Sequence, residues 1–202
     1  MSDLWYNFNN YYFRALCSVL LWRMIMFGMN KAQKHGLHIM IIGCGGAGKS
    51  TLARQLGENL GLPVVHLDQI WWAQGNWQHI TRENFDTQIM LEMDKPQWIM
   101  DGNFNRTIEL RLAKCDTVIY LDMPRIICLK NWIGRVIKNW GNARADMAPG
   151  CNEWFDPEMA GWIWRFNKDN RKRYYELLNQ LDNKQVYILK NRREVKAFLD
   201  TL

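Results

Sequence analysis

The segment GCGGAGKS, from Gly43 to Ser50, is the most informative part of the 202-residue sequence. It follows the short apolar run HIMII and precedes TLARQLGENL, in which leucine recurs every fourth residue. A short apolar run is typical of a strand that is buried on both faces, whereas the leucine spacing is typical of one helix face. The glycine-rich segment therefore lies where a strand ends and a helix begins.

This segment matches the pattern G-x-x-x-x-G-K-[ST], which predicts a phosphate-binding loop when it joins a strand to a helix. A triphosphate is a dense anion, so several backbone N–H groups must point at it together, and glycine permits that curvature. The N-terminus of the following helix adds partial positive charge. The residues predicted to bind ATP are Gly43, Cys44, Gly45, Gly46, Ala47, Gly48, Lys49, Ser50 and Thr51.

Two side chains of the loop also predict how Mg²⁺ and the phosphates are held. Lys49 is expected to reach the β- and γ-phosphates, and the Ser50 hydroxyl is expected to bind Mg²⁺. A carboxylate should complete the metal site, and two candidates end apolar runs, Asp101 and Asp122. We favour Asp101, because in kinases of this layout the third strand lies beside the first on the metal side. Asp122 is the alternative.

Short apolar runs and amphipathic segments alternate from Leu37 onward, which predicts an α/β domain with a parallel sheet and right-handed crossovers. Thr81 is expected to cap one helix. Asp156 followed by Pro157 predicts the start of a long helix that reaches about Leu181. Pro124 is expected to open another helix. Its apolar side is expected at Ile126, Ile127, Leu129, Ile133, Val136 and Ile137. The expected strands are residues 37–43, 62–68, 97–102, 116–122 and 185–190.

The charge of the chain is uneven. The net charge is +6, and residues 125–175 contain ten lysines and arginines but five acidic residues. Such a segment is either a solvated face or an anion-binding surface for nucleotide phosphates or nucleic acid.

The five cysteines form no C-x-x-C pair, and the four histidines show no metal-ligand spacing. We therefore expect a reduced, cytoplasmic protein without structural zinc. Cys44 lies near the predicted helix N-terminus, where we expect the pKa of its thiol to be lowered.

Residues 1–36 differ from the rest of the chain, because they are rich in aromatic residues and asparagine. Their apolar run, Ala15–Met29, is interrupted by Arg23 and is shorter than the roughly 20 residues that span a membrane. Three interpretations are open: a helix packed on the domain, an interfacial anchor, or upstream sequence translated from an early start codon. We favour the third, because the globular pattern needs nothing before His35.

With GCGGAGKS come four further motifs in order, VVHLDQIWW, WIMDGNF, TVIYLDMPR and RADMAPGC. Together they resemble the bacterial DNA topology modulation proteins (FlaR-like), in the adenylate-kinase-like branch of P-loop proteins. The resemblance covers about Leu37 to Leu202. It implies a three-layer α/β/α fold whose five-stranded parallel sheet has the order 2-3-1-4-5. It also implies an acceptor-binding segment after the second strand and a helical lid at about residues 135–165.

The resemblance extends to individual site residues. Asp68 matches the place where related small kinases keep an acidic residue facing the acceptor or the metal, although it could instead cap the following loop. Arg106 follows DGNFN, one residue later than the comparable arginine of adenylate kinases, so its role in binding an acceptor phosphate is open. Arginine suits the charge of a transferred phosphoryl group, so the lid arginines are candidates for stabilising it. Arg135 and Arg144 rank above those on the long helix, because some arginines of such a helix must simply be solvated. The lower-ranked lid arginines are Arg165 and Arg171.

Tryptophans gather in the same two regions. Such side chains either stack on a base or sugar ring of a substrate or pack the lid and loop against the core. Those of the acceptor segment are Trp71, Trp72 and Trp77. Those of the lid region are Trp132, Trp140, Trp154, Trp162 and Trp164.

The sequence therefore predicts a kinase that uses ATP and Mg²⁺ and transfers a phosphoryl group to a small acceptor, a nucleoside or nucleotide. One alternative is a kinase of a non-nucleotide hydroxyl acceptor. Another is a nucleotide-regulated DNA-binding protein that affects DNA topology. We expect no membrane span and a monomer or homodimer. The predicted catalytic residues are Lys49, Asp68, Arg135 and Arg144, and the predicted metal ligands are Ser50 and Asp101.

Overall fold

The computed structural model describes residues 37–202, so the predictions for residues 1–36 lie outside the described part of the chain. The strands are β1 (His38–Gly43), β2 (Val64–His66), β3 (Trp98–Asp101), β4 (Thr117–Leu121) and β5 (Gln185–Leu189). The helices are α2 (Lys49–Leu60), α3 (Leu67–Trp71), α4 (Arg82–Met93), α5 (Ile108–Lys114), α6 (Arg125–Lys138), α7 (Pro157–Asn179) and α8 (Arg192–Leu199). No helix within residues 37–202 is long and apolar enough to cross a membrane.

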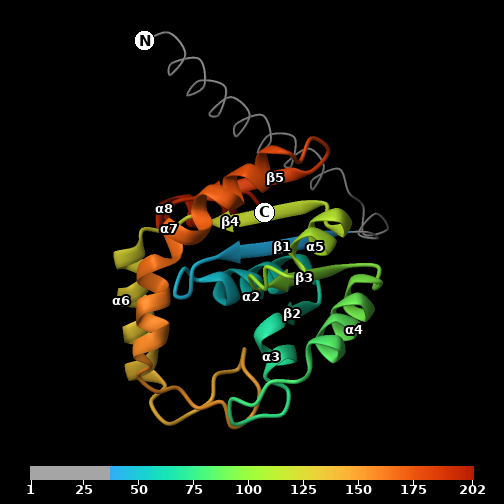
Figure 1. Cartoon of the computed structure of the whole chain (residues 1–202). Helices are drawn as coiled ribbons and strands as arrows, with labels where there is room; N and C mark the ends of the chain where they lie inside the picture. Colours follow the sequence, from blue (N-terminus) through green and yellow to red (C-terminus); the bar gives the residue numbers. More distant parts are fainter. Residues whose placement is uncertain (1–36) are drawn as a thin grey trace.

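The strands form a parallel sheet in the order β2-β3-β1-β4-β5 (Figure 1), which confirms the predicted topology. In this sheet β1 is central. Asp101 of β3 lies level with Ile41 on one side, and Leu121 of β4 lies level with Gly43 on the other. The carboxyl ends of these strands meet at one edge, which is where open α/β sheets bind their ligands.

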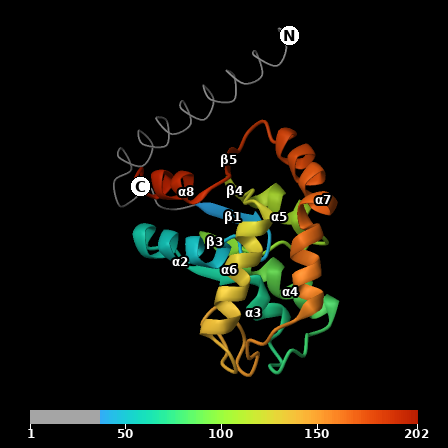
Figure 2. The same cartoon turned by 90° about the vertical axis from the view of Figure 1, so that its left-hand side faces the viewer.

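Helices cover both faces of the sheet and complete the three layers. Figure 2 shows α2 and α8 on one side and α5 and α7 on the other. As predicted, Leu52, Leu56 and Leu60 of α2 are buried. Gly61 ends this helix in a left-handed conformation with φ 65°, which glycine adopts without strain.

Two predicted helix starts are confirmed by their caps. Thr81 Oγ1 accepts a hydrogen bond from the backbone N–H of Asn84 at 3.2 Å, at the start of α4. Asp156 Oδ1 accepts one from the backbone N–H of Glu158 at 2.9 Å, and Pro157 opens α7. Both side chains satisfy N–H groups that a helix leaves unpaired at its first turn.

The second strand is shorter than predicted. β2 ends at His66 and α3 begins at Leu67, so Asp68 lies in the first turn of a helix rather than at the end of a strand. Gly102, which follows β3, packs against Leu67 at the start of α3. Its φ is 136°, and a Cβ there would lie 2.8 Å from Leu67 Cβ, so the close packing of Leu67 requires glycine.

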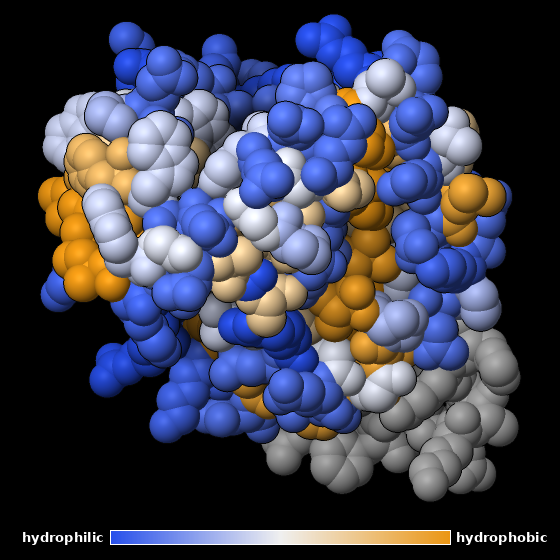
Figure 3. Space-filling model, turned by 90° about the horizontal axis from the view of Figure 1, so that it is seen from below, coloured by the Kyte–Doolittle hydropathy of each residue, from blue (hydrophilic) through white to orange (hydrophobic). Residues whose placement is uncertain are grey.

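The buried side of α6 also differs from the predicted one. Cys128, Trp132 and Val136 form the buried stripe. Of the six predicted residues, only Val136 is in this stripe, so the prediction is largely wrong. Aliphatic side chains occur on every side of α6, so their spacing alone does not identify the buried face. Figure 3 shows hydrophobic side chains at the left edge of the molecule, the side on which α6 lies in Figure 1. The exposed isoleucines of α6 are Ile126, Ile127, Ile133 and Ile137.

Candidate active site

The glycine-rich loop follows β1 and is fixed from two neighbouring elements. After β3, Asn103 accepts from the Gly43 N–H at 3.0 Å and donates to the Gly43 carbonyl at 2.9 Å. From α6, Asn131 donates to the Gly46 carbonyl at 2.9 Å. Gly46 has φ 75°, and a Cβ there would lie 2.1 Å from the carbonyl oxygen of Cys128. Only glycine therefore allows α6 to pack this closely on the loop.

The N-terminus of α2 fits a phosphate ligand. Its N-cap, Gly48, offers no side-chain cap, and the first turn of the helix contains no acidic residue. A Cβ at Gly48 would meet no atom within 4 Å in the described structure. Lys49 Nζ donates to the Cys44 carbonyl at 3.1 Å, which holds the ammonium group against the loop. The uncapped N–H groups and this ammonium group suit a dense anion.

The pKa of the Cys44 thiol differs from the predicted one. Contact with the Cys128 thiol and burial raise the pKa of Cys44, whereas the charge of Lys49 only partly opposes the rise. The prediction of a lowered pKa is wrong, because neighbouring α6 encloses this loop residue.

Asp101, the predicted magnesium ligand, ends β3 beside the loop. It is 4% exposed, and His66 Nδ1 donates to Asp101 Oδ1 at 2.5 Å. Burial by itself would lower the pKa of His66, but the hydrogen bond to Asp101 and the charge of that carboxylate raise it above its ordinary value. His66 is thus a partner that orients the carboxylate, as hydrogen-bonding neighbours of metal ligands do.

Asp68 lies where several charged groups converge. The residue is exposed, yet the protein that surrounds its carboxyl group raises the pKa of Asp68 above the ordinary aspartate value. The charge of Lys49 opposes this rise, while the charges of Asp101 and Asp146 add to it. The structure therefore brings the loop lysine and the predicted metal carboxylate close to the predicted acceptor residue.

Asp146 joins this site although the sequence interpretation assigned it no role. It lies between α6 and α7 and is 7% exposed. Burial by itself would raise the pKa of Asp146. The charge of Arg144 and the hydrogen bond from the Ser50 hydroxyl outweigh this effect, so the pKa of Asp146 lies below its ordinary value. The motif RADMAPGC contains this residue, yet no local pattern predicts its contact with Ser50.

The two favoured lid arginines form an ion-pair cluster around one buried carboxylate. Glu153 is 3% exposed, and its Oε1 lies 2.6 Å from Arg144 Nε and 3.3 Å from Arg135 Nε. Arg144 Nη1 also donates to Asp146 Oδ2 at 2.7 Å. The charges of both arginines reach Asp68. The structure thus places both arginines at the site, and Glu153, which the sequence interpretation missed, holds them there.

Asp122, the alternative metal ligand, is engaged by α7. Its Oδ2 accepts from Arg171 Nη2 at 2.8 Å and from the Tyr175 hydroxyl at 2.8 Å. This network joins β4 to α7 and leaves Asp101 as the better candidate for the metal. It also gives Arg171, a lower-ranked lid arginine, a structural partner.

Residues 69–77 pack against residues 145–152, and we call this contact the acceptor–lid seam. At one end, Gln69 Nε2 donates to the Ala145 carbonyl at 2.7 Å. At the other end, Trp77 Nε1 donates to the Asn152 carbonyl at 3.0 Å. Between them, Trp72 packs against Met147, Ala148 and Cys151. The segment predicted to bind the acceptor and the segment predicted to form the lid are thus in direct contact.

Packing explains three of the eight tryptophans. Trp71 stacks on His79 with ring centroids 4.6 Å apart and meets Phe85 edge-on at 5.2 Å, Trp132 is buried, and Trp72 packs within the acceptor–lid seam. The remaining five have exposed fractions between 36% and 62%, and stacking on a substrate stays a prediction for them: Trp77, Trp140, Trp154, Trp162 and Trp164.

Arg106 is engaged by α4. Its Nη2 lies 2.7 Å from Asp86 Oδ1 and donates to the Arg82 carbonyl at 2.7 Å. This pairing anchors Arg106 to α4, and its role in binding an acceptor phosphate stays open.

No protein-family model and no curated protein matches this chain, so its membership of the topology modulation group stays a prediction. Solved structures do resemble it. The shikimate kinase of Acinetobacter baumannii, in complex with shikimate, has a TM-score of 0.52 and 17% identity, over 84% of this chain and 92% of that one. The shikimate kinase of Bacteroides thetaiotaomicron has a TM-score of 0.50 and 14% identity, over 81% of this chain and 94% of that one. The chain therefore has the three-layer α/β/α fold of these P-loop kinases.

Proposed function

We propose that this chain is a phosphotransferase that uses ATP and Mg²⁺ to phosphorylate a hydroxyl group of a small molecule. One observation carries the proposal: Lys49, Ser50, Asp68 and Asp101 lie together where β1, β2 and β3 end. A phosphate loop alone would suit any nucleotide-binding protein. An acidic residue beside the loop lysine adds a group that can address an acceptor.

The donor side of the site follows from the loop and its neighbours. The N–H groups at the start of α2 and the ammonium group of Lys49 would bind the phosphates of ATP. Ser50 and Asp101 would hold Mg²⁺, which would neutralise charge on the phosphates. No cluster of three His, Cys, Asp or Glu residues able to hold a metal ion lies within residues 37–202. Few protein ligands suit Mg²⁺, which takes other ligands from phosphates and water.

The acceptor side depends on Asp68 and the ion-pair cluster. Ionised Asp68 would orient the acceptor hydroxyl and accept its proton as the hydroxyl oxygen bonds to the γ-phosphorus of ATP. The bond between that phosphorus and the β–γ bridging oxygen would break at the same time, and ADP would leave. Arg135 and Arg144, held near Asp68 by Glu153, would stabilise the charge of the transferred group. The acceptor–lid seam would shield the reacting groups from water.

The alternatives carry less support. Of the ten lysines and arginines in residues 125–175, Arg135, Arg144 and Arg171 pair with buried acidic residues of the domain, which partly neutralises their charge. The likeness to shikimate kinases favours a small hydroxyl acceptor. The motif resemblance to FlaR-like proteins suggests a relationship but names no acceptor.

The test is consumption of ATP by the purified chain, with Mg²⁺, in the presence of nucleosides, nucleoside monophosphates and sugar acids in turn. We expect turnover that depends on one acceptor class and is lost in Lys49→Ala. Lys95→Ala is the matched control, because Lys95 pairs with Glu92 on the surface. ATP binding without turnover by any acceptor would contradict the proposal and favour a nucleotide-switched binding protein.

A further inference from the structure

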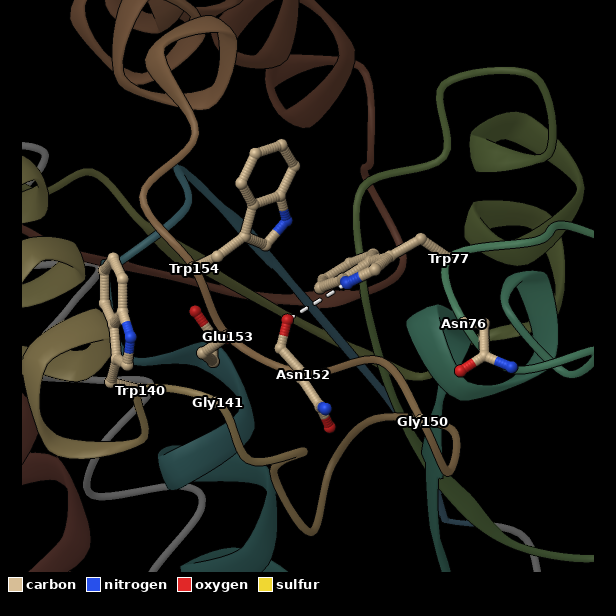
Figure 4. Close-up of a pocket in the computed structure, with 8 residues that line it drawn as sticks. All are labelled: Asn76, Trp77, Trp140, Gly141, Gly150, Asn152, Glu153 and Trp154. Carbon is tan, nitrogen blue, oxygen red and sulfur yellow. Dashed lines mark hydrogen bonds between the residues drawn. The ribbon is translucent and has the colours of Figure 1, made fainter.

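A pocket of about 370 Å³ lies at the outer end of the acceptor–lid seam. Three tryptophans line it, Trp77 from the acceptor segment and Trp140 and Trp154 from the loop between α6 and α7. Figure 4 shows Trp77 and Trp140 on opposite sides, with Asn152 and Glu153 between them. Flat apolar faces on several sides suit a flat ring, since aromatic rings stack favourably on indole.

The backbone that presents Trp77 is strained. Gly75, Asn76 and Trp77 have φ values of 75°, 51° and 59°, a left-handed run that side chains larger than glycine rarely adopt. Contacts with the opposite segment stabilise this left-handed conformation. One of them is the hydrogen bond that Trp77 Nε1 donates to the Asn152 carbonyl at 3.0 Å. A Cβ at Gly150 would lie 2.5 Å from Asn76 Oδ1, so the two segments touch closely. Strain of this kind is concentrated at binding sites, where the rest of the fold maintains it.

The charge of the pocket favours a neutral ligand. Its single charged lining residue, Glu153, is paired with Arg135 and Arg144, and the rest of the lining consists of Asn, Gly and Trp. A phosphate group would find no unpaired cation there. The amides of Asn76 and Asn152 each offer one donor group and one acceptor, a combination that matches the polar edge of a nucleobase.

We infer that this pocket binds the nucleobase of a nucleoside acceptor. The inference rests on the proposed function and narrows its acceptor class. Position supports it, because Gln69, next to Asp68, begins the seam that ends at the pocket. A nucleoside at this end of the seam would place its base between the tryptophans, against the two segments that begin beside Asp68 and Arg144. Glu153 joins the pocket to the two arginines, so an occupied pocket would also steady them.

The test measures binding of nucleosides to the full chain by calorimetry, with a saturating non-hydrolysable ATP analogue and Mg²⁺. Trp140→Ala and Trp154→Ala are the probes, because both side chains are exposed and their loss should not unfold the domain. We expect each to weaken nucleoside binding about tenfold, as for loss of one stacking partner. The matched control is Trp164→Ala, an exposed tryptophan outside the pocket whose ring lies 4.1 Å from the Arg125 guanidinium.

Several outcomes would overturn the inference. Ribose or a sugar acid that binds as tightly as nucleosides would show that the base is not recognised. Nucleoside binding that the pocket variants leave unchanged would place the base elsewhere. If the ATP analogue competes with nucleosides and the variants weaken the analogue instead, the pocket holds the base of the donor.

The inference and the proposed function can fail separately. Lys49→Ala should abolish turnover but leave nucleoside binding intact, which supports the pocket assignment. Nucleosides that bind through the tryptophans yet accept no phosphate would uphold the pocket and contradict the kinase proposal. Phosphorylation of a sugar acid with no nucleoside binding would uphold the kinase and overturn the pocket assignment.

Discussion

His66 and Asp101 lie level with each other on neighbouring strands, β2 and β3. A buried carboxylate without a partner is costly, because it loses its hydration. The hydrogen bond from His66 Nδ1 supplies part of the missing compensation, and the same contact raises the pKa of His66. A bound Mg²⁺ would supply positive charge at the same carboxylate, so we expect the pair to tune metal binding.

His66→Gln tests this pair. Loss of a hydrogen-bonding partner of a metal ligand typically weakens metal binding by about 10- to 100-fold, so we expect a rise of that size in the Mg²⁺ concentration for half-maximal turnover. His38→Gln is the control, because His38 contacts Asp116 and the Lys95 carbonyl. An unchanged Mg²⁺ requirement in His66→Gln would contradict the assignment of Asp101 to the metal.

The pH dependence of turnover tests Asp68. As a proton acceptor, Asp68 must be ionised, so turnover should fall as the pH drops through its pKa. Because that pKa is raised, the midpoint of the acid limb should lie above the ordinary value of about 3.9. Asp146→Asn removes a negative charge that contributes to the rise, so the midpoint should move to lower pH. A midpoint that stays or moves upward in Asp146→Asn would argue against Asp68 as the titrating group.

At the scale of elements, the packing of α6 on the glycine loop depends on one missing side chain. Gly46→Ala should push α6 away, because the new Cβ would lie 2.1 Å from the Cys128 carbonyl and φ is 75°. We expect weaker binding of ATP and a lower melting temperature. Gly134→Ala is the matched control on α6, where a Cβ meets nothing within 4 Å in the described structure. It should instead stabilise the fold by roughly 0.5–1 kcal/mol, the helical preference of alanine over glycine.

The loop between α6 and α7 depends on the ion pairs of Glu153. Glu153→Gln leaves Arg135 and Arg144 without their shared carboxylate. Removing one partner of a buried ion pair typically costs about 3–5 kcal/mol, and partial exposure of Arg135 favours the lower end. We therefore expect a loss of roughly 3 kcal/mol in the free energy of unfolding, measured by urea denaturation, together with reduced turnover. Glu58→Gln, at an exposed position on α2, should leave both unchanged. Equal stability of the two variants would contradict a structural role for Glu153.

At the scale of the whole molecule, the features that could be predicted from the sequence are those that depend on residues close together in the chain. The glycine loop, the caps at Thr81 and Asp156, and the alternation of strands and helices each depend on neighbouring residues, and the structure confirms them. The sheet order follows from the family resemblance and is also confirmed. The candidate site residues are brought together, although their roles stay predictions.

What the sequence leaves out depends on contacts between distant segments. His66 meets Asp101, and Asp146 meets Ser50, only after the sheet has formed and the loop after α6 has folded back. Glu153 looks like an ordinary loop carboxylate until Arg135 and Arg144 surround it. On α6, aliphatic residues on all sides leave the choice of buried face to tertiary packing.

We propose above all that this chain moves a phosphoryl group from ATP to an acceptor hydroxyl at Asp68. The most direct measurement follows radioactive γ-phosphate from ATP into a separated product, for the unaltered chain and for Asp68→Asn. We predict labelled phosphoester with the unaltered chain, at least about 100-fold less with Asp68→Asn, and ATP binding retained in both. Label found only in inorganic phosphate, or equal product from the two proteins, would contradict the account.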